Sequence, residues 1–499
     1  MSNPPDVDIL LLLEGTYPYI KGGVSSWMHE VIRGLDHYRF GVVFLGSGKG
    51  DYEGWRYELP PNVMQVQSHF LFDQVKEPAK RPRRAKRGPN QAIETTIRQF
   101  HDRLQTSQPD MPTSRELTDP DSPIGHAMFL QSESAWNYLT GRYEASALAE
   151  SFVDYFWTVR NMHAPLWLLG KIAAQLPSAR LLFSPSTGYA GLLGAMCARE
   201  RGTPFVLMEH GIYTRERRID MMNADWIHDR RNFLQTDQAE ISHLRALWVT
   251  FFETASRQAY SKADPIISLF DRARRQQIAD GAAAERTRII PNGVEIERFV
   301  GLRRPLDAPI PAVMALIARV VPIKDIKNFI RAAAIAGQQL PQLQAWIVGP
   351  TEEDPPYVLE CRELVLSLGL EETVHFLGFR RVEEILPNVG VVVLSSVSEG
   401  LPLSVLEGFA AGIPAVTTDV GACREMIEGS GEANDVPGSA GGVAGLADPD
   451  ELAAHVLSLL TDPQRYRHAV ETAIARVERR YDRLTMLATF DQLFREAIG

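Results

Sequence analysis

Two patterns of hydrophobic residues alternate along the chain. Short runs rich in Val, Ile and Leu predict buried strands, because strands of a parallel sheet are covered on both faces. Segments with apolar residues at helical spacing follow them and predict the covering helices. The first such series is a strand at Asp8–Leu13, a glycine loop, a helix at Val24–Leu35 and a strand at Arg39–Leu45. This order is typical of a doubly wound α/β sheet.

The alternation occurs in two parts of the chain, and we therefore expect two Rossmann-like α/β domains with parallel sheets. The first domain is predicted from further strands at Arg180–Phe183, Pro204–Met208 and Pro265–Phe270. The second is predicted from strands at Ala312–Ile317, Gln344–Val348, Thr373–Phe376, Val391–Leu394 and Ala415–Thr417. We place the domains at residues 1–300 and 301–480, with the Pro-rich Leu302–Pro311 as linker. A chain of 499 residues is also too long for one ordinary core.

Residues 50–165 interrupt this pattern. Charges and turn residues predominate, and helical spacing appears only later, as at Glu144–Arg160, so we expect a partly helical insertion in the first domain. The run Lys80–Arg87 contains six basic residues out of eight. It is interpreted either as a solvated loop or as a docking site for an acidic partner or anionic lipid. A final helix is expected within residues 481–499.

Composition narrows the class of protein. With 45% hydrophobic and 23% charged residues, the chain resembles a soluble globular protein. A net charge of −10 argues against a general nucleic-acid binder, which needs a basic surface. The three cysteines lack metal-ligand spacing and indicate free thiols in a reducing compartment. The apolar run Ile9–Leu13 is too short for a transmembrane segment, so we expect a cytoplasmic protein that reaches the membrane, if at all, through partners.

Two acidic residues, Glu399 and Glu407, follow the apolar run at Val391–Leu394. Pro402 suits the first turn of a helix, so Glu399 is expected in a loop and Glu407 in the second helical turn. Both carboxylates would then face a crevice at the carboxyl end of the strand, where ligands bind in open α/β sheets. Taken singly, each is equally consistent with a solvated loop residue or a charge that offsets the helix dipole.

Other polar residues also follow predicted strands. Arg319 and Lys324 come directly after the first strand of the second domain, where two cations can grip a diphosphate together with the helix N-terminus near Pro402. Paired Gly22 and Gly23 allow a ligand to approach the backbone, although turns also use glycine. His210 follows the strand Pro204–Met208 and is interpreted either as a structural residue or as a site residue. The sequence shows no convincing set of metal ligands.

These motifs resemble family 4 of the retaining glycosyltransferases. The resemblance rests on Ser398–Glu407, Ala411–Val416 and Gly421–Glu425, on Arg319 and Lys324, and on Asn292–Glu295, where Glu295 replaces the usual Asp. It implies the GT-B fold, in which two Rossmann-like domains face each other across a cleft. It also implies hexosyl transfer from a UDP-sugar donor with no required metal or further cofactor.

The resemblance assigns a role to each candidate residue. Glu399 would bind hydroxyls of the donor sugar, and Glu407 the ribose. Gly400, Leu401 and Leu403 would place backbone groups near the diphosphate, which Arg319 and Lys324 grip. His210 would reach the donor sugar from the first domain, beside the Gly22–Gly23 loop. Phe379 and Arg380 lie where the family often holds the base, and the last helix is expected to cross back to the first domain.

A narrower resemblance, at Leu12–Trp27 and Met208–Arg217, is to the cytosolic glycosyltransferases of bacterial Pel exopolysaccharide synthesis. It implies transfer from UDP-GalNAc, UDP-GlcNAc or UDP-glucose to a growing exopolysaccharide, and docking to an inner-membrane secretion complex. Two alternatives stay open. One is a nucleotide-sugar epimerase of the same fold, and the other is a non-catalytic subunit that binds nucleotide sugar.

Overall fold

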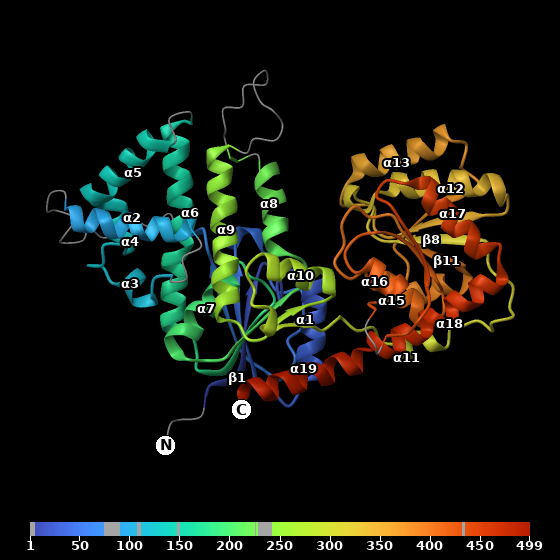
Figure 1. Ribbon diagram of the computed structural model, residues 1–499, viewed down its shortest axis with the longest axis horizontal. Coiled ribbons are helices and arrows are strands. Elements are labelled where there is room, and N and C mark those ends of the chain that lie inside the picture. The colour runs from blue at the N-terminus through green and yellow to red at the C-terminus, as the bar shows by residue number, and fades with distance from the viewer. Residues whose placement is uncertain are drawn as a thin grey trace. The chain divides into compact units, whose positions relative to one another are not determined.

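The computed structural model describes residues 5–73, 90–106, 111–146, 150–224, 226–227, 242–431 and 435–499. The basic run at 80–87 lies outside these residues. The chain divides into two compact units (Figure 1). The first comprises residues 1–268, 274–288 and 491–499, and the second residues 269–273 and 289–490. Each unit contains one parallel sheet covered by helices, which confirms the predicted fold class.

The sheet of the first unit has strands in the order β3-β2-β1-β4-β5-β6-β7. Their bounds are β1 (Val7–Glu14), β2 (Phe40–Gly46), β3 (Val63–Phe70), β4 (Ala179–Ser184), β5 (Phe205–Glu209), β6 (Ile266–Ser268) and β7 (Thr287–Ile289). The order reverses between β1 and β4, and this topological switch point is where a ligand crevice is expected. The strand β3 was not predicted because half of its residues are polar and they leave no continuous apolar run.

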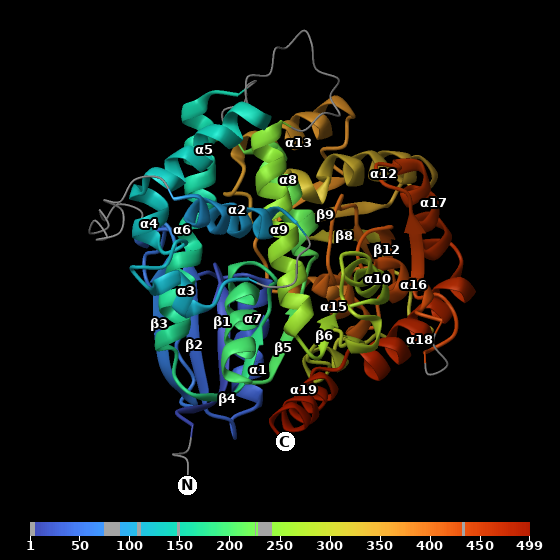
Figure 2. The same cartoon turned by 60° about the vertical axis from the view of Figure 1, so that its left-hand side comes forward.

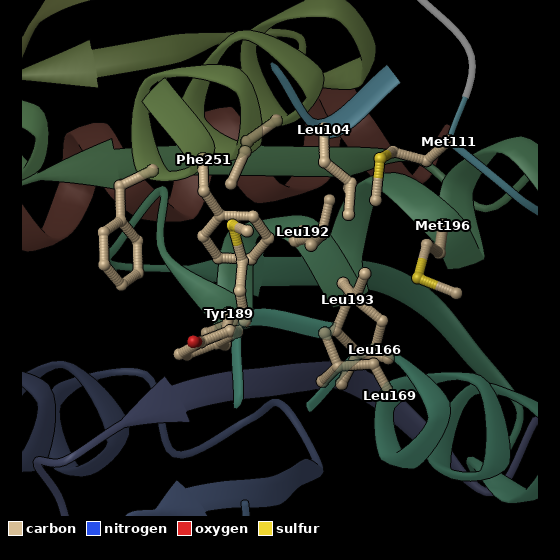
Figure 3. Close-up of a cluster of buried hydrophobic side chains, with 14 of the residues drawn as sticks. Leu104, Met111, Leu166, Leu169, Tyr189, Leu192, Leu193, Met196 and Phe251 are labelled. Atoms are coloured by element: carbon tan, nitrogen blue, oxygen red, sulfur yellow. The ribbon is translucent and has the colours of Figure 1, made fainter. Parts of the chain in front are cut away.

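Helices cover both faces of this sheet. The helix α7 (Tyr189–Arg201) lies on β1, β4 and β5, with α6 (Phe152–Gln175) and α9 (His243–Lys262) packed against it. On the other face, Trp27 of α1 (Gly23–Gly34) and Phe494 of α19 (Arg483–Ile498) both contact Phe183. The core between α6, α7 and α9 includes Leu166, Leu192 and Phe251 (Figure 3).

The predicted insertion forms a group of helices beside this sheet in Figure 2. They are α2 (Gln91–Gln105), α3 (Ser114–Thr118), α4 (His126–Gln131), α5 (Glu133–Ser146) and the start of α6. Two further helices, α8 (Tyr213–Asn223) and α10 (Asp271–Ala279), follow β5 and β6. No helix among the described residues is long and apolar enough to cross a membrane.

The sheet of the second unit has the order β10-β9-β8-β11-β12-β13, and its described strand pairs are parallel. The bounds are β8 (Val313–Ile317), β9 (Gln344–Val348), β10 (Val374–Gly378), β11 (Val391–Leu394), β12 (Ala415–Thr418) and β13 (Gly441–Ala444). Here the order reverses between β8 and β11. Every strand predicted in this unit is present, and β13 was missed because its two glycines weaken the strand pattern.

Two layers of helices enclose this sheet. One contains α12 (Ile326–Gln339) and α17 (Pro449–Leu460), with α13 (Pro355–Ser367) beside α12. The other contains α15 (Leu403–Ala410), α16 (Cys423–Glu428) and α18 (Pro463–Arg480). Short helices α11 (Glu297–Val300) and α14 (Val382–Ile385) complete the unit.

The Pro-rich segment expected to be a linker lies inside the second unit. Arg303 donates to the carbonyl of Ala410 and pairs with Glu478 at 2.7 Å. Arg304 donates to the carbonyls of Pro387 and Val389. These contacts fix the segment to the helices around α15.

Candidate functional site

Lys324 and Glu399 meet at the switch point of the second sheet. Lys324 follows β8 and Glu399 follows β11, the two strands between which the order reverses. The Lys324 Nζ lies 2.5 Å from Glu399 Oε1, and the Ser396 hydroxyl donates to the same oxygen at 2.6 Å. The two charged side chains are only 17% and 12% exposed. The structure therefore brings together two residues that are 75 positions apart in the chain.

Hydrogen bonds between loops fix this contact. The Ser395 hydroxyl donates to the carbonyls of Lys324 and Asp325 at 2.9 Å, and the Val397 amide donates to the Ile323 carbonyl at 2.9 Å. From the end of β12, the Thr418 hydroxyl donates to the Ser396 carbonyl at 2.6 Å. Loops after three neighbouring strands thus hold one another at the carboxyl edge of the sheet.

Gly421 allows a fourth segment to approach the Glu399 loop. Its φ of +53° is in the left-handed region, and a Cβ there would lie 2.2 Å from the Gly400 carbonyl oxygen and 2.4 Å from that of Glu399. The following amide, of Ala422, donates to the Gly400 carbonyl at 2.9 Å. Glycine is required here both by the backbone conformation and by the lack of space.

The helix α15 begins at Leu403, directly after Pro402. Among the described residues, no side chain caps this N-terminus. The first amides of a helix have no partner within the helix and carry the positive end of its dipole. Leu401 is buried, whereas Leu403 is 42% exposed. The N-terminus therefore adjoins the Glu399 loop with backbone groups suited to an anion, as the sequence predicts.

Arg319 pairs with a different carboxylate from the one that Lys324 contacts. Its guanidinium pairs with Glu353 at 2.6 Å, and both side chains are about half exposed, at 55% and 46%. An exposed pair of this kind contributes little to stability, on the order of 0–1 kcal/mol. The Arg319 side chain can therefore exchange Glu353 for an anionic ligand at small cost.

Glu407 lies in the second turn of α15, as predicted, and its side chain is partly buried. Burial raises the pKa of Glu407 to about 7, against an opposing effect of Arg298 and a further upward effect of Glu383. Arg298 forms an ion pair with Glu383 through Nε. The hydrogen bond from Arg298 lowers the pKa of Glu383 to about 2. Sequence reasoning missed Arg298 and Glu383, because they lie on two separate helices, α11 and α14, that only the fold brings together.

Phe379 and Arg380 follow β10 at the same edge of the second sheet. The Phe379 side chain is 74% exposed, next to Gly378 with a φ of +64°. The Arg380 guanidinium donates to the Phe379 carbonyl at 3.3 Å. An exposed aromatic ring at a strand end offers a flat surface for stacking.

In the first unit, His210 directly follows β5. Its ring makes an edge contact with Trp27 at 4.6 Å, and burial lowers its pKa to about 4. Both ring nitrogens are buried, and neither has a hydrogen-bond partner among the described residues. The imidazole is therefore neutral at pH 7 and retains an unused donor and acceptor.

The preceding residue, Glu209, was not predicted. Its buried carboxyl accepts hydrogen bonds from Tyr260 at 2.6 Å, Gln277 at 3.0 Å and Thr187 at 3.1 Å. It also accepts one from the Tyr213 amide at 3.3 Å, just beyond His210. Glu209 therefore anchors the turn that carries His210.

Gly22 and Gly23 begin helix α1, and the space beside both is open. At the switch point of this sheet, Glu14 of β1 accepts from the Tyr213 hydroxyl at 3.0 Å and from the Ala190 amide at 3.3 Å. His210, Gly22 and Gly23 thus belong to the first unit, and the other predicted residues to the second. Among the described residues, no group of three or more His, Cys, Asp or Glu side chains could hold a metal ion.

Matches to two protein families divide the chain near the boundary between the two units. The family described as "Domain of unknown function (DUF3492)" matches residues 7–285, and "Glycosyl transferases group 1" matches residues 306–476. A putative glycosyltransferase, EpsD of Bacillus subtilis, is 36% identical over 105 residues, 21% of this chain and 26% of that protein. The D-inositol 3-phosphate glycosyltransferase of Geodermatophilus obscurus is 29% identical over 220 residues, 41% and 47% of the two chains.

The exopolysaccharide phosphotransferase SCO2592 of Streptomyces coelicolor is 34% identical over 142 residues, 28% of this chain. These matches span 14% to 47% of the relatives' own lengths. Among solved structures, Alr3699/HepE of Anabaena in complex with UDP has a TM-score of 0.59 at 17% identity, covering 98% and 100% of the chains. The same protein was solved with UDP-glucose. Sucrose-phosphate synthase of Thermosynechococcus elongatus has a TM-score of 0.55 at 16% identity, covering 98% of each chain. These likenesses support the GT-B fold.

Proposed function

Because the chain belongs to the family described as domain of unknown function DUF3492 and its residues 306–476 match glycosyl transferases group 1, we propose that it is a glycosyltransferase with a nucleotide-sugar donor. The observation that carries the proposal is the Lys324–Glu399 contact at the switch point of the second sheet. This contact places a cation, a carboxylate and an uncapped helix N-terminus at the edge where α/β sheets bind ligands.

The chemistry of the pair matches the two halves of such a donor. Lys324 supplies a positive charge for the diphosphate, and the amides at the start of α15 supply donors. Glu399 supplies acceptors for the hydroxyls of the sugar. Transfer breaks the bond between the anomeric carbon and the diphosphate oxygen, which keeps the electron pair. The acceptor hydroxyl bonds to that carbon and passes its proton to an oxygen of the departing diphosphate, so stabilisation of this leaving group is the main demand on the protein.

Further residues extend the proposed donor site. Arg319 would leave Glu353 to bind the diphosphate, Glu407 would accept the ribose hydroxyls, and Phe379 with Arg380 would hold the base. In the first unit, neutral His210 and the Gly22–Gly23 loop would have the sugar-binding role that the sequence resemblance implies. Gly400, Leu401 and Leu403 would line the diphosphate side. No metal is required in this scheme, because Lys324, Arg319 and the helix N-terminus provide the positive charge.

The finer assignment follows the sequence resemblance. The reaction would be a retaining transfer of the family 4 type, from UDP-glucose, UDP-GlcNAc or UDP-GalNAc to a growing exopolysaccharide of the Pel kind. Two relatives, an exopolysaccharide phosphotransferase and a lipopolysaccharide 1,6-galactosyltransferase, are named for work on polysaccharides, which supports this acceptor class. A cytoplasmic location and docking to a membrane secretion complex belong to the same proposal. Release of UDP together with a new glycoside distinguishes transfer from epimerisation.

Lys324→Ala tests the proposal, with Lys327→Ala as its matched control. Both lysines contact a glutamate at 2.5 Å, but Lys327 pairs with exposed Glu360, away from the switch point. With UDP-glucose, UDP-GlcNAc and UDP-GalNAc as donors, UDP release should fall by about 10²–10³-fold in Lys324→Ala, as when one stabilising group is removed from a transition state. Lys327→Ala should stay within about twofold. Equal losses in the two variants would contradict the assignment.

Binding is measured separately by thermal shift. A donor at about 100 times its Kd stabilises the protein by about 2.7 kcal/mol, which a melting curve resolves. If none of the three UDP-sugars shifts the melting curve, the protein is not a glycosyltransferase for these donors.

A further inference from the structure

We propose that Asp325 and Ser395 are positioning residues that hold Lys324 in place to bind the diphosphate of the nucleotide. The inference rests on the proposed function, in which Lys324 meets the charge of the diphosphate. Neither Asp325 nor Ser395 belongs to the predicted donor site.

Asp325 has a backbone conformation that few residues adopt. Its φ of 43° and ψ of 56° lie in the left-handed region. Among the described residues other than glycine, only Ala447 shares a positive φ, of 52°. Asp and Asn tolerate this region better than most residues, because their short polar side chains form local hydrogen bonds. Residues in such conformations gather at functional sites, so the position of Asp325 directly after Lys324 indicates a role in binding.

The left-handed residue joins two helical segments. The 3₁₀ turn η5 (Pro322–Lys324) ends directly before Asp325, and α12 begins directly after it. The Asp325 amide donates to the Pro322 carbonyl at 3.0 Å, and its carboxylate accepts from the Asn328 amide at 3.3 Å. Because a single residue joins the two segments, its φ and ψ fix the direction in which the turn that carries Lys324 leaves the helix.

Ser395 holds the backbone of the same turn. It directly follows β11 and is only 1% exposed. Its hydroxyl is shared between the carbonyl oxygens of Lys324 and Asp325, at 2.9 Å from each. The next residue, Ser396, donates to the Glu399 carboxylate at 2.6 Å. Two neighbouring serines therefore fix both members of the Lys324–Glu399 contact, one through the backbone and the other through the side chain.

Asp325 also caps helix α12, and a cap alone would affect stability without affecting ligand binding. Ser and Asn are both good capping residues, but Asn tolerates the left-handed region whereas Ser does so rarely. Asp325→Asn should therefore bind UDP as the wild type does. Asp325→Ser should bind UDP about five- to thirtyfold more weakly, which is the factor that the left-handed penalty of an ordinary residue corresponds to. Equal affinity in the two variants would mean that Asp325 is a cap and nothing more.

The test is calorimetric titration of the full chain with UDP at pH 8, below the melting transition of each variant. The decisive measurement is a double-mutant cycle with Lys324→Ala. Asp325→Ser and Ser395→Ala should each weaken UDP binding about fivefold or more in the wild-type background, and by less than about twofold in the Lys324→Ala background. A merely structural role would cost the same affinity in both backgrounds. Should Lys324→Ala bind UDP too weakly to measure, the contrast between Asp325→Asn and Asp325→Ser decides.

Two control variants complete the design. Ala447→Gly relaxes the other positive φ, after β13, and should leave the affinity for UDP unchanged. Ser458→Ala removes a hydroxyl that donates to the His455 carbonyl at 2.9 Å within α17, and should also leave the affinity unchanged. Losses in these controls as large as in Asp325→Ser, or wild-type affinity in Asp325→Ser, would overturn the inference. Absence of UDP binding by the wild type would instead refute the proposed function.

Discussion

At the scale of single residues, Glu407 opposes stability. Its pKa in the folded protein is raised to about 7, above the ordinary value of 4.5, so the folded state binds more protons than the unfolded state between these values. Stability therefore falls as the pH rises through this window, and the penalty is fully present above pH 7. The penalty is on the order of 1–3 kcal/mol.

Glu407→Gln should therefore stabilise the unliganded protein at pH 8. The neutral amide removes the buried charge, and the unfolding midpoint of the second unit should rise by a few degrees. At pH 4.5 the wild-type carboxyl is protonated and the difference should nearly vanish. Thermal unfolding at both pH values measures the effect, with Glu297→Gln as an exposed control. A lower melting temperature for Glu407→Gln at pH 8 would show that the carboxylate has a partner that stabilises it.

Sequence reasoning selected Glu399, Glu407 and Lys324 as candidates because each follows a predicted strand in the chain. It did not find Arg298, Glu383 or Glu209. These three act through partners that the fold brings from distant segments, as when Tyr260 and Gln277 reach Glu209 from α9 and α10. No local pattern distinguishes such a residue from a surface charge. The sequence also did not indicate that Lys324 would contact Glu399 directly.

At the scale of elements, the loops after β8, β11 and β12 form one hydrogen-bonded assembly. Its closest approach is at Gly421, where the backbone passes the carbonyls of Glu399 and Gly400. A change there should move the whole Glu399 loop, whereas a strained glycine elsewhere should affect stability alone.

Gly421→Ala and Gly369→Ala separate these two effects. Both glycines have a φ in the left-handed region, +53° and +65°, so both substitutions should cost about 1–2 kcal/mol. Only at Gly421 would the new Cβ strike backbone, since the space beside Gly369 is open. Gly421→Ala should therefore weaken UDP-sugar binding at least tenfold, while Gly369→Ala should bind as the wild type does. Titration calorimetry below the melting transition measures both, and unchanged affinity in Gly421→Ala would mean that the Glu399 loop does not bind the donor.

Strands in the middle of the sheets were predictable, as was the edge strand β10, whereas the edge strands β3 and β13 were not. Central strands such as β11 are continuous apolar runs, because helices cover both faces. The strands β3 and β13 lack that signal, since half of the residues of β3 are polar and β13 opens with two glycines. The helices α2 to α5 were predicted only as a partly helical insertion, because α3 and α4 are short and turn residues separate the four helices.

At the scale of the whole molecule, the chain combines two units of similar architecture with different family relationships. The match to glycosyl transferases group 1 covers residues 306–476, all within the second unit. The first unit carries the DUF3492 match and the helices α2 to α6. The proposed donor site is therefore concentrated in one unit, and ligand binding should stabilise the two units unequally.

Hydrogen–deuterium exchange with and without UDP-glucose tests this asymmetry. Loops at the edge of a sheet open locally more often than core strands, so a ligand that binds them slows their exchange. A ligand concentration of about 100 times the Kd stabilises the bound protein by about 2.7 kcal/mol. Amides that exchange only through openings that release the ligand should therefore exchange about 100-fold more slowly. Peptides covering residues 319–325 and 396–408 should be protected, and those from α2 to α5 should not change. Protection confined to the first unit would place the nucleotide away from Lys324 and Glu399, and the Lys324→Ala variant should then retain its affinity for UDP-glucose.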